Sequence, residues 1–329
     1  MRRKATAFVA LGTFLFLACA LGLLLGAAPL SPSSVWNGLT DGSSDPAARS
    51  IMLSLRLPRV VAGIFTGAGL AVSGALFQAL LRNPLAEPYL LGVSSGAAFG
   101  AVAALTLGLP WLGSSGLVLA GLVGALLAIT IVFRVAHGVG RLDTRIMILT
   151  GVVVAAFFGA GVMLMLTIAR GEAMRAAILW TMGSLSGVSW KMTLALGLYT
   201  GVSSIGAFAI ARHLNALSLG EESAASLGTR VEGIKRAAYL LASLLAAAAV
   251  SVAGIIGFIG LVVPHAVRLA WGADHRYLIP LCFLGGGGVL VLADTLARTT
   301  FRPLELPVGV VTALLGVPLF LVLLRRRYV

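Results

Sequence analysis

Charged residues are scarce in this sequence, and acidic residues are the scarcest. Only 11% of its 329 residues are charged, with 11 Asp and Glu against 24 Lys and Arg. Hydrophobic residues make up 59% of the chain, and the mean hydropathy is +1.03. A soluble core needs a polar surface around it, and this composition cannot supply one. The chain is therefore predicted to be a membrane protein with lipid around it.

Cysteine frameworks and catalytic motifs are missing as well. Cys19 and Cys282 lie in apolar segments without a CxxC pattern, which argues against disulfides and against a structural metal. The sequence contains no GxxxxGK(S/T), HExxH or GxSxG motif, so we expect no nucleotide-phosphate site and no nucleophile. The histidines are too scattered to form an axial pair for haem: His137, His213, His265 and His275. We predict no metal site, no cofactor and no enzymatic activity, so energy must enter through a partner.

The positive charge is distributed along the whole chain. The formal net charge is +13, which in a soluble protein would suggest nucleic acid. Here the basic residues separate apolar segments and form no single patch, so they indicate membrane topology and no nucleic-acid partner.

Long apolar segments predict membrane-spanning helices, since a bilayer core needs about 20 apolar residues per helix. They lie near residues 5–28, 57–80, 90–109, 114–136, 146–169, 191–211, 236–271, 277–297 and 306–324. The first follows Arg2-Arg3-Lys4 and is too long for a cleaved signal peptide. The segment 236–271 would be roughly 54 Å long as one helix, so a turn at Gly254, Gly257 or Gly260 is expected to divide it in two.

Both chain ends are basic, which predicts that both termini are cytoplasmic and that the number of spans is even. The fold predicted for residues 1–329 is a single all-α polytopic domain of ten transmembrane helices. Eight cations fall on the outer side in this topology, against sixteen of the 24 inside. The outward ones are Arg49, Arg56, Arg59, Arg170, Arg175, Lys191, Arg298 and Arg302.

Glycines recur every four residues in two segments, at Gly63 and Gly67 and at Gly92, Gly96 and Gly100. This spacing puts them on one helix face, where the absence of a side chain permits close helix packing.

The largest cytoplasmic loop, residues 212–236, predicts a short helix of its own. The helix would begin after Ser218 or Gly220, carry Glu221 and Glu222 in its first turn, and end at Gly228. Taken alone, an ordinary capped loop helix would have the same pattern.

Several motifs together make the chain resemble a known family. Glu222, Ala224 and Gly228 match the E-x-A-x-x-x-G coupling loop of ABC importer permeases. Further matches are RLPR at 56–59, NPLAEP at 83–88, LGVSSG at 91–96, GFIGLVVPH at 257–265, DHR at 274–276 and ELPVG at 305–309. The order and spacing resemble FecCD-type permeases, which carry ferric siderophores, haem or vitamin B12. The resemblance implies a type II ABC importer permease fold.

The resemblance also implies site residues. Those of the ATPase-coupling loop are Glu221, Glu222, Ala224, Leu227 and Gly228, and those bordering a cytoplasmic gate are Asn83, Leu85, Asp143 and Thr144. The alternatives are that the prolines at 84 and 88 merely turn the chain, and that the loop with Asp143 merely anchors it.

The outer cations Arg56, Arg59 and Arg298 are expected, by the same resemblance, to receive acidic residues of a periplasmic binding protein. Snorkelling to lipid headgroups is the alternative. Asp294, an acid within a predicted span, is one turn from Arg298, and an i, i+4 ion pair is its simplest interpretation.

Residues 170–190 are expected to form a short periplasmic helix at the mouth of the pathway. Nearby methionines could line it, although such residues more often face the core or lipid: Met163, Met165, Met174 and Met182, with Trp180.

The function implied is the transmembrane subunit of an inner-membrane importer that passes a large metal chelate, a ferric siderophore, haem or cobalamin, into the cytoplasm. Its partners would be a second copy of itself, two ATPase subunits, a periplasmic binding protein and membrane lipid. The alternative is an ion-coupled secondary transporter, which needs intramembrane acids or broken-helix ion sites and no coupling loop.

Overall fold

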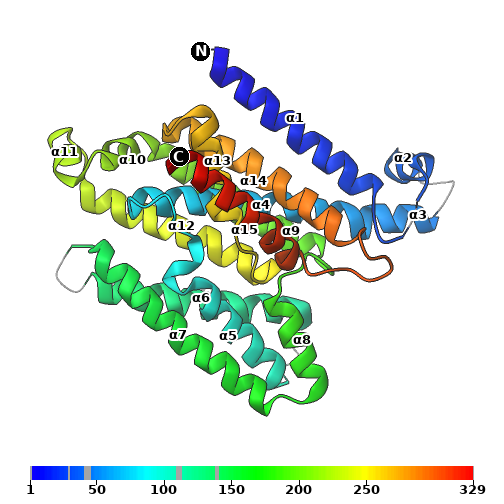
Figure 1. The fold of residues 1–329 in the computed structure, drawn as a ribbon. Coiled ribbons are helices and arrows are strands. Elements are labelled where there is room, and N and C mark those ends of the chain that lie inside the picture. Colours follow the sequence, from blue (N-terminus) through cyan, green and yellow to red (C-terminus); the bar gives the residue numbers. More distant parts are fainter. Residues whose placement is uncertain (1, 29, 41–45, 109–112, 138–140, 329) are drawn as a thin grey trace.

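The computed structural model describes residues 2–28, 30–40, 46–108, 113–137 and 141–328, which fold into helices (Figure 1). Within them the only strand-like pairing is one bridge between Phe301 and Leu304. The elements are α1 (Arg2–Leu24), α2 (Pro32–Thr40), α3 (Pro46–Ser50), η1 (Ile51–Arg56), α4 (Leu57–Leu80), η2 (Pro88–Leu91), α5 (Val93–Thr106), α6 (Gly113–Ala136), α7 (Thr144–Ile168), α8 (Gly171–Thr181), α9 (Trp190–Ala209), α10 (Ala211–Ser218), α11 (Glu221–Ser226), α12 (Val231–Ala253), α13 (Ile259–Trp271), α14 (His275–Ala297) and α15 (Val308–Tyr328).

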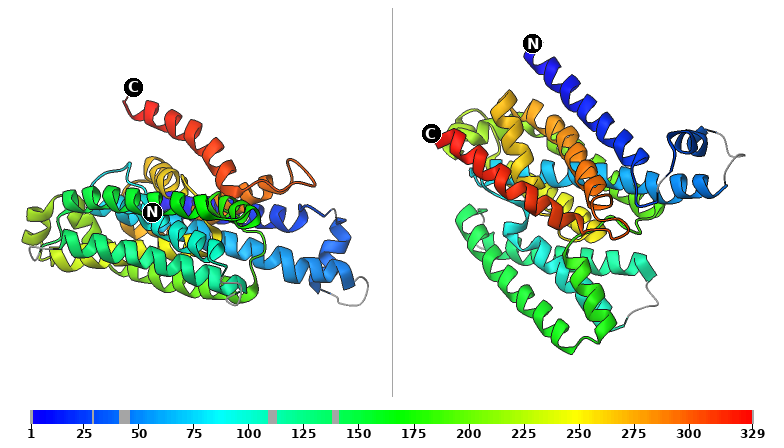
Figure 2. Two further views of the ribbon diagram at one scale, coloured as in Figure 1. Left: turned by 90° about the horizontal axis from the view of Figure 1, so that it is seen from below. Right: turned by 45° about the vertical axis from the view of Figure 1, so that its right-hand side comes forward.

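Helix α4 is the centre of the molecule. It packs against α9, α12, α13 and α14, and nearly all of its residues are buried (Figure 1). Helices α5 to α8 lie together on one side of α12, whereas α1, α13, α14 and α15 lie on the other. Seen from below, the C-terminal part of α15 projects from the layer that the other helices form (Figure 2). The all-α fold predicted from the sequence is therefore confirmed.

The apolar segment 236–271 is two helices, as predicted. Helix α12 ends at Ala253 and α13 begins at Ile259, and both Gly254 and Phe258 have φ of +69°. A left-handed backbone at the non-glycine Phe258 is unusual and marks a sharp change of direction.

A second break faces this one from the other half of the chain. Between α4 and α5, the Glu87 Oε1 accepts a hydrogen bond of 2.9 Å from the Phe258 N–H, and the Tyr89 hydroxyl accepts one of 3.3 Å from the Ile256 N–H. Two side chains thus satisfy backbone groups that the broken helix leaves unpaired, which a membrane interior requires.

The lengths of the apolar helices can be compared with the ten spans that the sequence predicts. Seven described helices are long and apolar enough to cross a membrane, and three shorter apolar ones are Val93–Thr106, Ile259–Trp271 and Val308–Leu323. At 1.5 Å per residue, α5 and α13 are only about 20 Å long, less than a hydrocarbon core of about 30 Å. Ten spans remains a prediction. The predicted end of one segment at residue 109 lies outside the described residues.

The glycines of the pattern pack closely against neighbouring segments, and four of the five lie within helices. A Cβ on Gly96 would lie 2.4 Å from the Gly124 carbonyl oxygen on α6, and one on Gly67 would lie 2.2 Å from the Gly286 oxygen on α14. The predicted helix position was wrong for Gly92, which has φ of +76° and joins η2 to α5, although a Cβ there would lie 3.1 Å from the Val154 side chain on α7. It serves as a left-handed cap because the chain must turn there before the helix begins.

The α4–α14 contact gives a stability prediction. The Gly67→Ala variant should lose about 1–3 kcal/mol of unfolding free energy, because its Cβ meets backbone that cannot move aside. Thermal unfolding of the detergent-purified protein measures this. Gly159→Ala on α7, where a Cβ would meet nothing within 4 Å, is the matched control and should not lower the midpoint. Equal midpoints for the two variants would contradict the packing role of Gly67.

Candidate functional site

The short cytoplasmic helix predicted in the loop 212–236 is present as α11. Gly220 precedes it with φ of +116°, Glu221 and Glu222 occupy the first turn, and Gly228 follows it with φ of +78°. Ala224 is fully buried against the rest of the chain, whereas Leu227 is 67% exposed. The helix therefore has an anchored face and an exposed face on which Glu222 and Leu227 lie.

A chain of ion pairs joins α11 to neighbouring segments of the chain. We call Arg82, Glu221, Lys235 and Glu232 the ion-pair chain. The Glu221 Oε1 lies 3.2 Å from both the Arg82 guanidinium and the Lys235 ammonium, and Lys235 lies 3.1 Å from Glu232. The Lys235 side chain is only 5% exposed, so its two pairs are shielded from water on one side, whereas Arg82 and Glu221 are 44% and 38% exposed and form an ordinary surface pair.

The ion-pair chain ends beside both loops of the predicted gate. Arg82, with φ of +48°, immediately precedes Asn83, and Glu232 Oε2 accepts a hydrogen bond of 2.8 Å from the N–H of Leu142, which precedes Asp143. The helix that carries the coupling motif is thus bonded to both segments. Arg82 and Lys235 are two of the sixteen cations predicted to lie inside, and the i, i+3 spacing of Glu232 and Lys235 is the one signal in the sequence for their pair.

The residues predicted to border a gate have local structural roles. Asn83 accepts a hydrogen bond of 2.9 Å from the Leu85 N–H, and the Leu85 side chain is 41% exposed. Asp143 caps α7 by accepting from the N–H groups of Arg145 and Ile146, and these bonds lower the pKa of its carboxyl. Thr144 is the first residue of α7. These contacts fit a turn and a capped helix, and they leave Leu85 free to border an opening.

At the opposite end of the molecule, Arg59 forms a second charge cluster. Its Nε and Nη2 donate to the Asp294 carboxylate at 2.9–3.1 Å, and its Nη1 donates to Glu305 at 2.8 Å. The Arg298 Nε is 3.5 Å from Asp294, which confirms the expected i, i+4 pair. We call Arg59, Asp294, Arg298 and Glu305 the outer charge cluster. It joins α4 to α14 and to the loop before α15, and the pair of Asp294 with Arg298 is the one that the sequence predicts.

The side chains of Arg56 and Arg298 are buried in the folded protein. They are 4% and 3% exposed, and their guanidinium groups donate to backbone carbonyls at the C-terminal end of α1. Arg56 Nη1 donates to Leu23 at 2.6 Å, and Arg298 Nη2 donates to Gly22 at 2.6 Å. These donors satisfy carbonyls that a helix end leaves unpaired. The side chains therefore do not snorkel to lipid headgroups, and docking by these two arginines remains a prediction.

The predicted periplasmic helix is α8, followed by a turn at Gly183 with φ of +73°. Met163, Met174 and Met182 are 73%, 38% and 40% exposed. Their proposed lining role remains a prediction. No group of three metal-ligating side chains occurs in the part of the chain that the structure describes.

The outer charge cluster predicts the effect of removing its acid. Asp294→Asn should destabilise the protein by about 3–5 kcal/mol, because Arg59 and Arg298 would be left without their shared buried carboxylate. Glu305→Gln removes an acid that is 31% exposed and should cost less than about 1 kcal/mol. Thermal unfolding in detergent compares them, and equal losses would contradict the central position of Asp294.

Comparison with known proteins agrees with this geometry. Residues 14–326 match the FecCD transport family. The cobalamin import system permease protein BtuC of Halobacterium salinarum is 46% identical over 301 residues, 89% of this chain and 80% of that protein. The hemin transport system permease protein HmuU of Yersinia pestis is 42% identical over 307 residues, 92% of this chain and 90% of that protein.

A solved structure has the same fold as this chain. A metal-chelate type ABC transporter in an inward-facing conformation superimposes with a TM-score of 0.87 at 30% identity, covering 98% of this chain and 99% of that one. The predicted type II ABC importer permease fold is confirmed. The family match spans nearly the whole sequence, and the chain therefore belongs to the FecCD transport family.

Proposed function

We propose that this chain is the transmembrane subunit of an ATP-driven importer that passes a large metal chelate, a ferric siderophore, haem or cobalamin, from periplasm to cytoplasm. Its family membership supports a permease, and relatives named for cobalamin, hemin and iron(3+)-hydroxamate support the substrate class. Residues 1–329 would act as one membrane domain with both termini in the cytoplasm.

The observation that carries the proposal is the bonded connection from α11 to the two gate loops. The exposed face with Glu222 and Leu227 is suited to a groove in a separate ATPase subunit, and Glu221 is on the same short helix. When the ATPase moves α11, Glu221 carries the displacement to Arg82 and Lys235. Asn83 and Leu85 follow Arg82 directly, and Glu232 links Lys235 to the segment that begins α7.

The assembly we propose contains two copies of this chain around one pathway, two ATPase subunits inside and one substrate-loaded binding protein outside. Arg59 is partly accessible but already paired with two acids, so a docking partner would have to share it. Exposed cations on the same side offer further contacts for carboxylates: Arg49, Arg170, Arg175, Lys191 and Arg302.

An ion-coupled transporter is not favoured, because the obvious intramembrane acid is not free. Asp294 is 2% exposed and already neutralised by Arg59 and Arg298. A carboxylate that carries protons or sodium has to release its counter-charge during each cycle.

The direct test of the proposed function is uptake into proteoliposomes that hold the chain with its ATPase and binding protein. We expect uptake of the cognate chelate to need ATP and to persist without a proton gradient; gradient-driven uptake by the chain alone would refute the proposal.

Leu227 tests the docking face of α11. Leu227→Asp should lower the affinity for the ATPase at least about tenfold, because a charge would enter an apolar contact. Co-purification of the tagged complex and titration with isolated ATPase measure this. Leu304, equally apolar and 73% exposed in the loop that follows α14, provides the matched control Leu304→Asp, which should keep full ATPase binding. If Leu227→Asp also keeps it, α11 is not the docking element.

Lys235 tests the transmission of movement. Lys235→Met removes the cation that joins Glu221 to Glu232, so ATPase should still bind while uptake per ATP hydrolysed falls several-fold. Lys235→Arg keeps the charge and should retain most of the coupling. The ratio of chelate imported to phosphate released in proteoliposomes measures the effect. An unchanged ratio in Lys235→Met, with normal ATPase binding, would exclude the ion-pair chain from transmission.

A further inference from the structure

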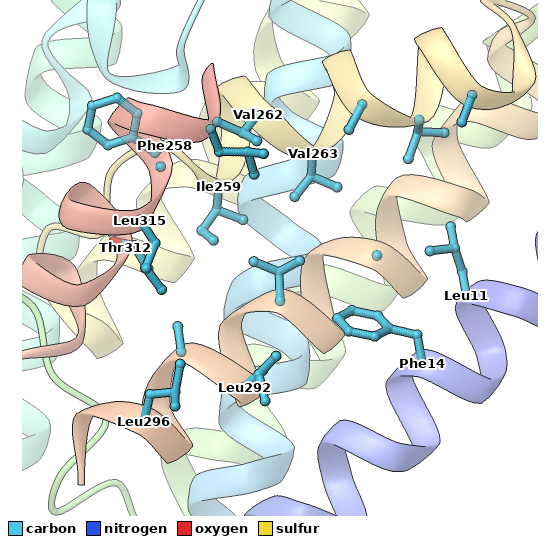
Figure 3. Close-up of a pocket in the computed structure, with 18 of the residues that line it drawn as sticks. Leu11, Phe14, Phe258, Ile259, Val262, Val263, Leu292, Leu296, Thr312 and Leu315 are labelled. Carbon is cyan, nitrogen blue, oxygen red and sulfur yellow. The ribbon is translucent and has the colours of Figure 1, made fainter. Parts of the chain in front are cut away.

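An apolar groove on the side of the molecule away from α5 to α8 is not used by the proposed mechanism. It has a volume of about 420 Å³, and α1, α13, α14 and α15 form its walls (Figure 3). Leu11 and Phe14 of α1 point into it, opposite Phe258 and Leu315 (Figure 3). Thr312 is the only lining residue with a polar side chain besides the indole nitrogen of Trp271. The groove therefore suits a hydrocarbon chain.

The groove has the length of an acyl chain. Its lining runs along α13 from Phe258 to Trp271, which is about 20 Å at 1.5 Å per residue. Trp271 is at one end, and tryptophan is enriched where hydrocarbon meets lipid headgroups. This end of the groove therefore corresponds to the membrane surface.

A group of cations lies at that same end. Arg3 Nη2 donates to the carbonyl oxygen of Ala270, a groove residue, at 3.1 Å. The Lys4 ammonium lies 3.6 Å from the centre of the Tyr277 ring, and the Arg276 guanidinium lies 5.9 Å from it. Asp274 neutralises one of these charges by pairing with Arg276 at 2.7 Å, so three cations and one carboxylate leave a positive excess.

The N-terminal helix connects the cations to the groove. Lys4, Ala7, Leu11 and Phe14 are spaced by three, four and three residues, which places them on one face of α1. Ala7 is fully buried, and Leu11 and Phe14 line the groove. The same face thus presents a cation at the membrane surface and apolar side chains about 10 Å and more below it.

From these two observations we infer that the groove binds one anionic phospholipid, with its phosphate at Arg3 and Lys4 and an acyl chain between α1 and α15. Basic pockets between transmembrane helices on the cytoplasmic side attract acidic headgroups. The inference depends on the proposed function in one respect. The membrane orientation proposed there assigns the headgroup to the cytoplasmic leaflet.

A second copy of this chain fits the groove less well. Two copies in one membrane with the same orientation bring their cytoplasmic ends together, and the exposed face of α7 ends there in Arg145, with Arg141 just before it. The two cations outnumber the exposed Asp143 between them, so this end of α7 is net positive and would meet Arg3 and Lys4 with like charge. A phosphate meets them with the opposite charge, so charge complementarity favours the lipid.

Native mass spectrometry of the delipidated protein tests the inference directly. Phosphatidylglycerol and phosphatidylcholine with identical acyl chains are titrated separately, and one phosphatidylglycerol per chain is expected to bind more tightly. The Arg3→Ala/Lys4→Ala variant should weaken phosphatidylglycerol binding about 25-fold, roughly fivefold for each cation, and leave phosphatidylcholine binding unchanged. Arg141→Ala/Arg145→Ala removes two exposed cytoplasmic cations elsewhere and should change neither affinity.

Ala266→Phe, which fills the groove from α13, separates the acyl site from a general charge effect. It should weaken both lipids, whereas Val152→Phe on the exposed face of α7 should weaken neither. Equal binding of the two lipids to the unsubstituted chain would overturn the inference. So would an Ala266→Phe variant that binds lipid normally but no longer self-associates, because the groove would then belong to a second copy. Lipid binding is measured without ATP or chelate, so its failure leaves the proposed transport function standing.

Discussion

Every backbone polar group within a membrane must find a partner inside the protein, since lipid offers none. Helices meet this requirement automatically, but this chain interrupts its helices twice, between α4 and α5 and between α12 and α13. The two interruptions lie against each other, so that side chains of the first can pair with backbone N–H groups of the second. The Glu87 carboxyl and the Tyr89 hydroxyl accept hydrogen bonds from the backbone of the second break. Each interruption thereby depends on the other, which joins the N-terminal and C-terminal halves at that point.

The same requirement explains the end of the molecule at which α1 and α14 terminate. Helix α1 ends at Leu24, and its last carbonyls receive hydrogen bonds from the buried arginines at 56 and 298. Those cations would be costly in a dry interior without compensation. Asp294 and the carbonyls supply it. Cations that break the positive-inside trend are therefore explained in part by helix packing, and a contribution to docking would be additional.

Sequence reasoning succeeded where the signal is local. The length of one apolar segment correctly predicted that α4 runs from residue 57 to residue 80. The segment 236–271 is too long for one span and contains three glycines, which correctly predicted that it is two helices. The capped helix α11 followed from its acids and flanking glycines. Gly92 was assigned wrongly because a glycine at helical spacing can equally be a left-handed cap, and spacing alone does not distinguish them.

Contacts between distant segments could not be predicted in the same way. Arg59 and Asp294 are 235 residues apart, and Arg82 and Glu221 are 139 apart, so no periodic pattern connects them. Each residue was visible as a charge, but its partner depends on how α4 packs against α14 and on where α11 folds back. For the site, the sequence therefore predicted the docking helix and the gate loops separately. Their connection through Lys235 became visible only in the structure.

The central claim is that movement of α11 reaches the gate loops. It is tested most directly by the distance between spin labels attached at Leu85 in the two copies of the chain, in the complex with the ATPase. The account predicts two distinct distances, one without nucleotide and one with ATP bound, and a clearly smaller difference between them when Arg82 is replaced by Met, because Arg82 joins Glu221 to the segment that carries Leu85. One unchanging distance in the unsubstituted complex would contradict it.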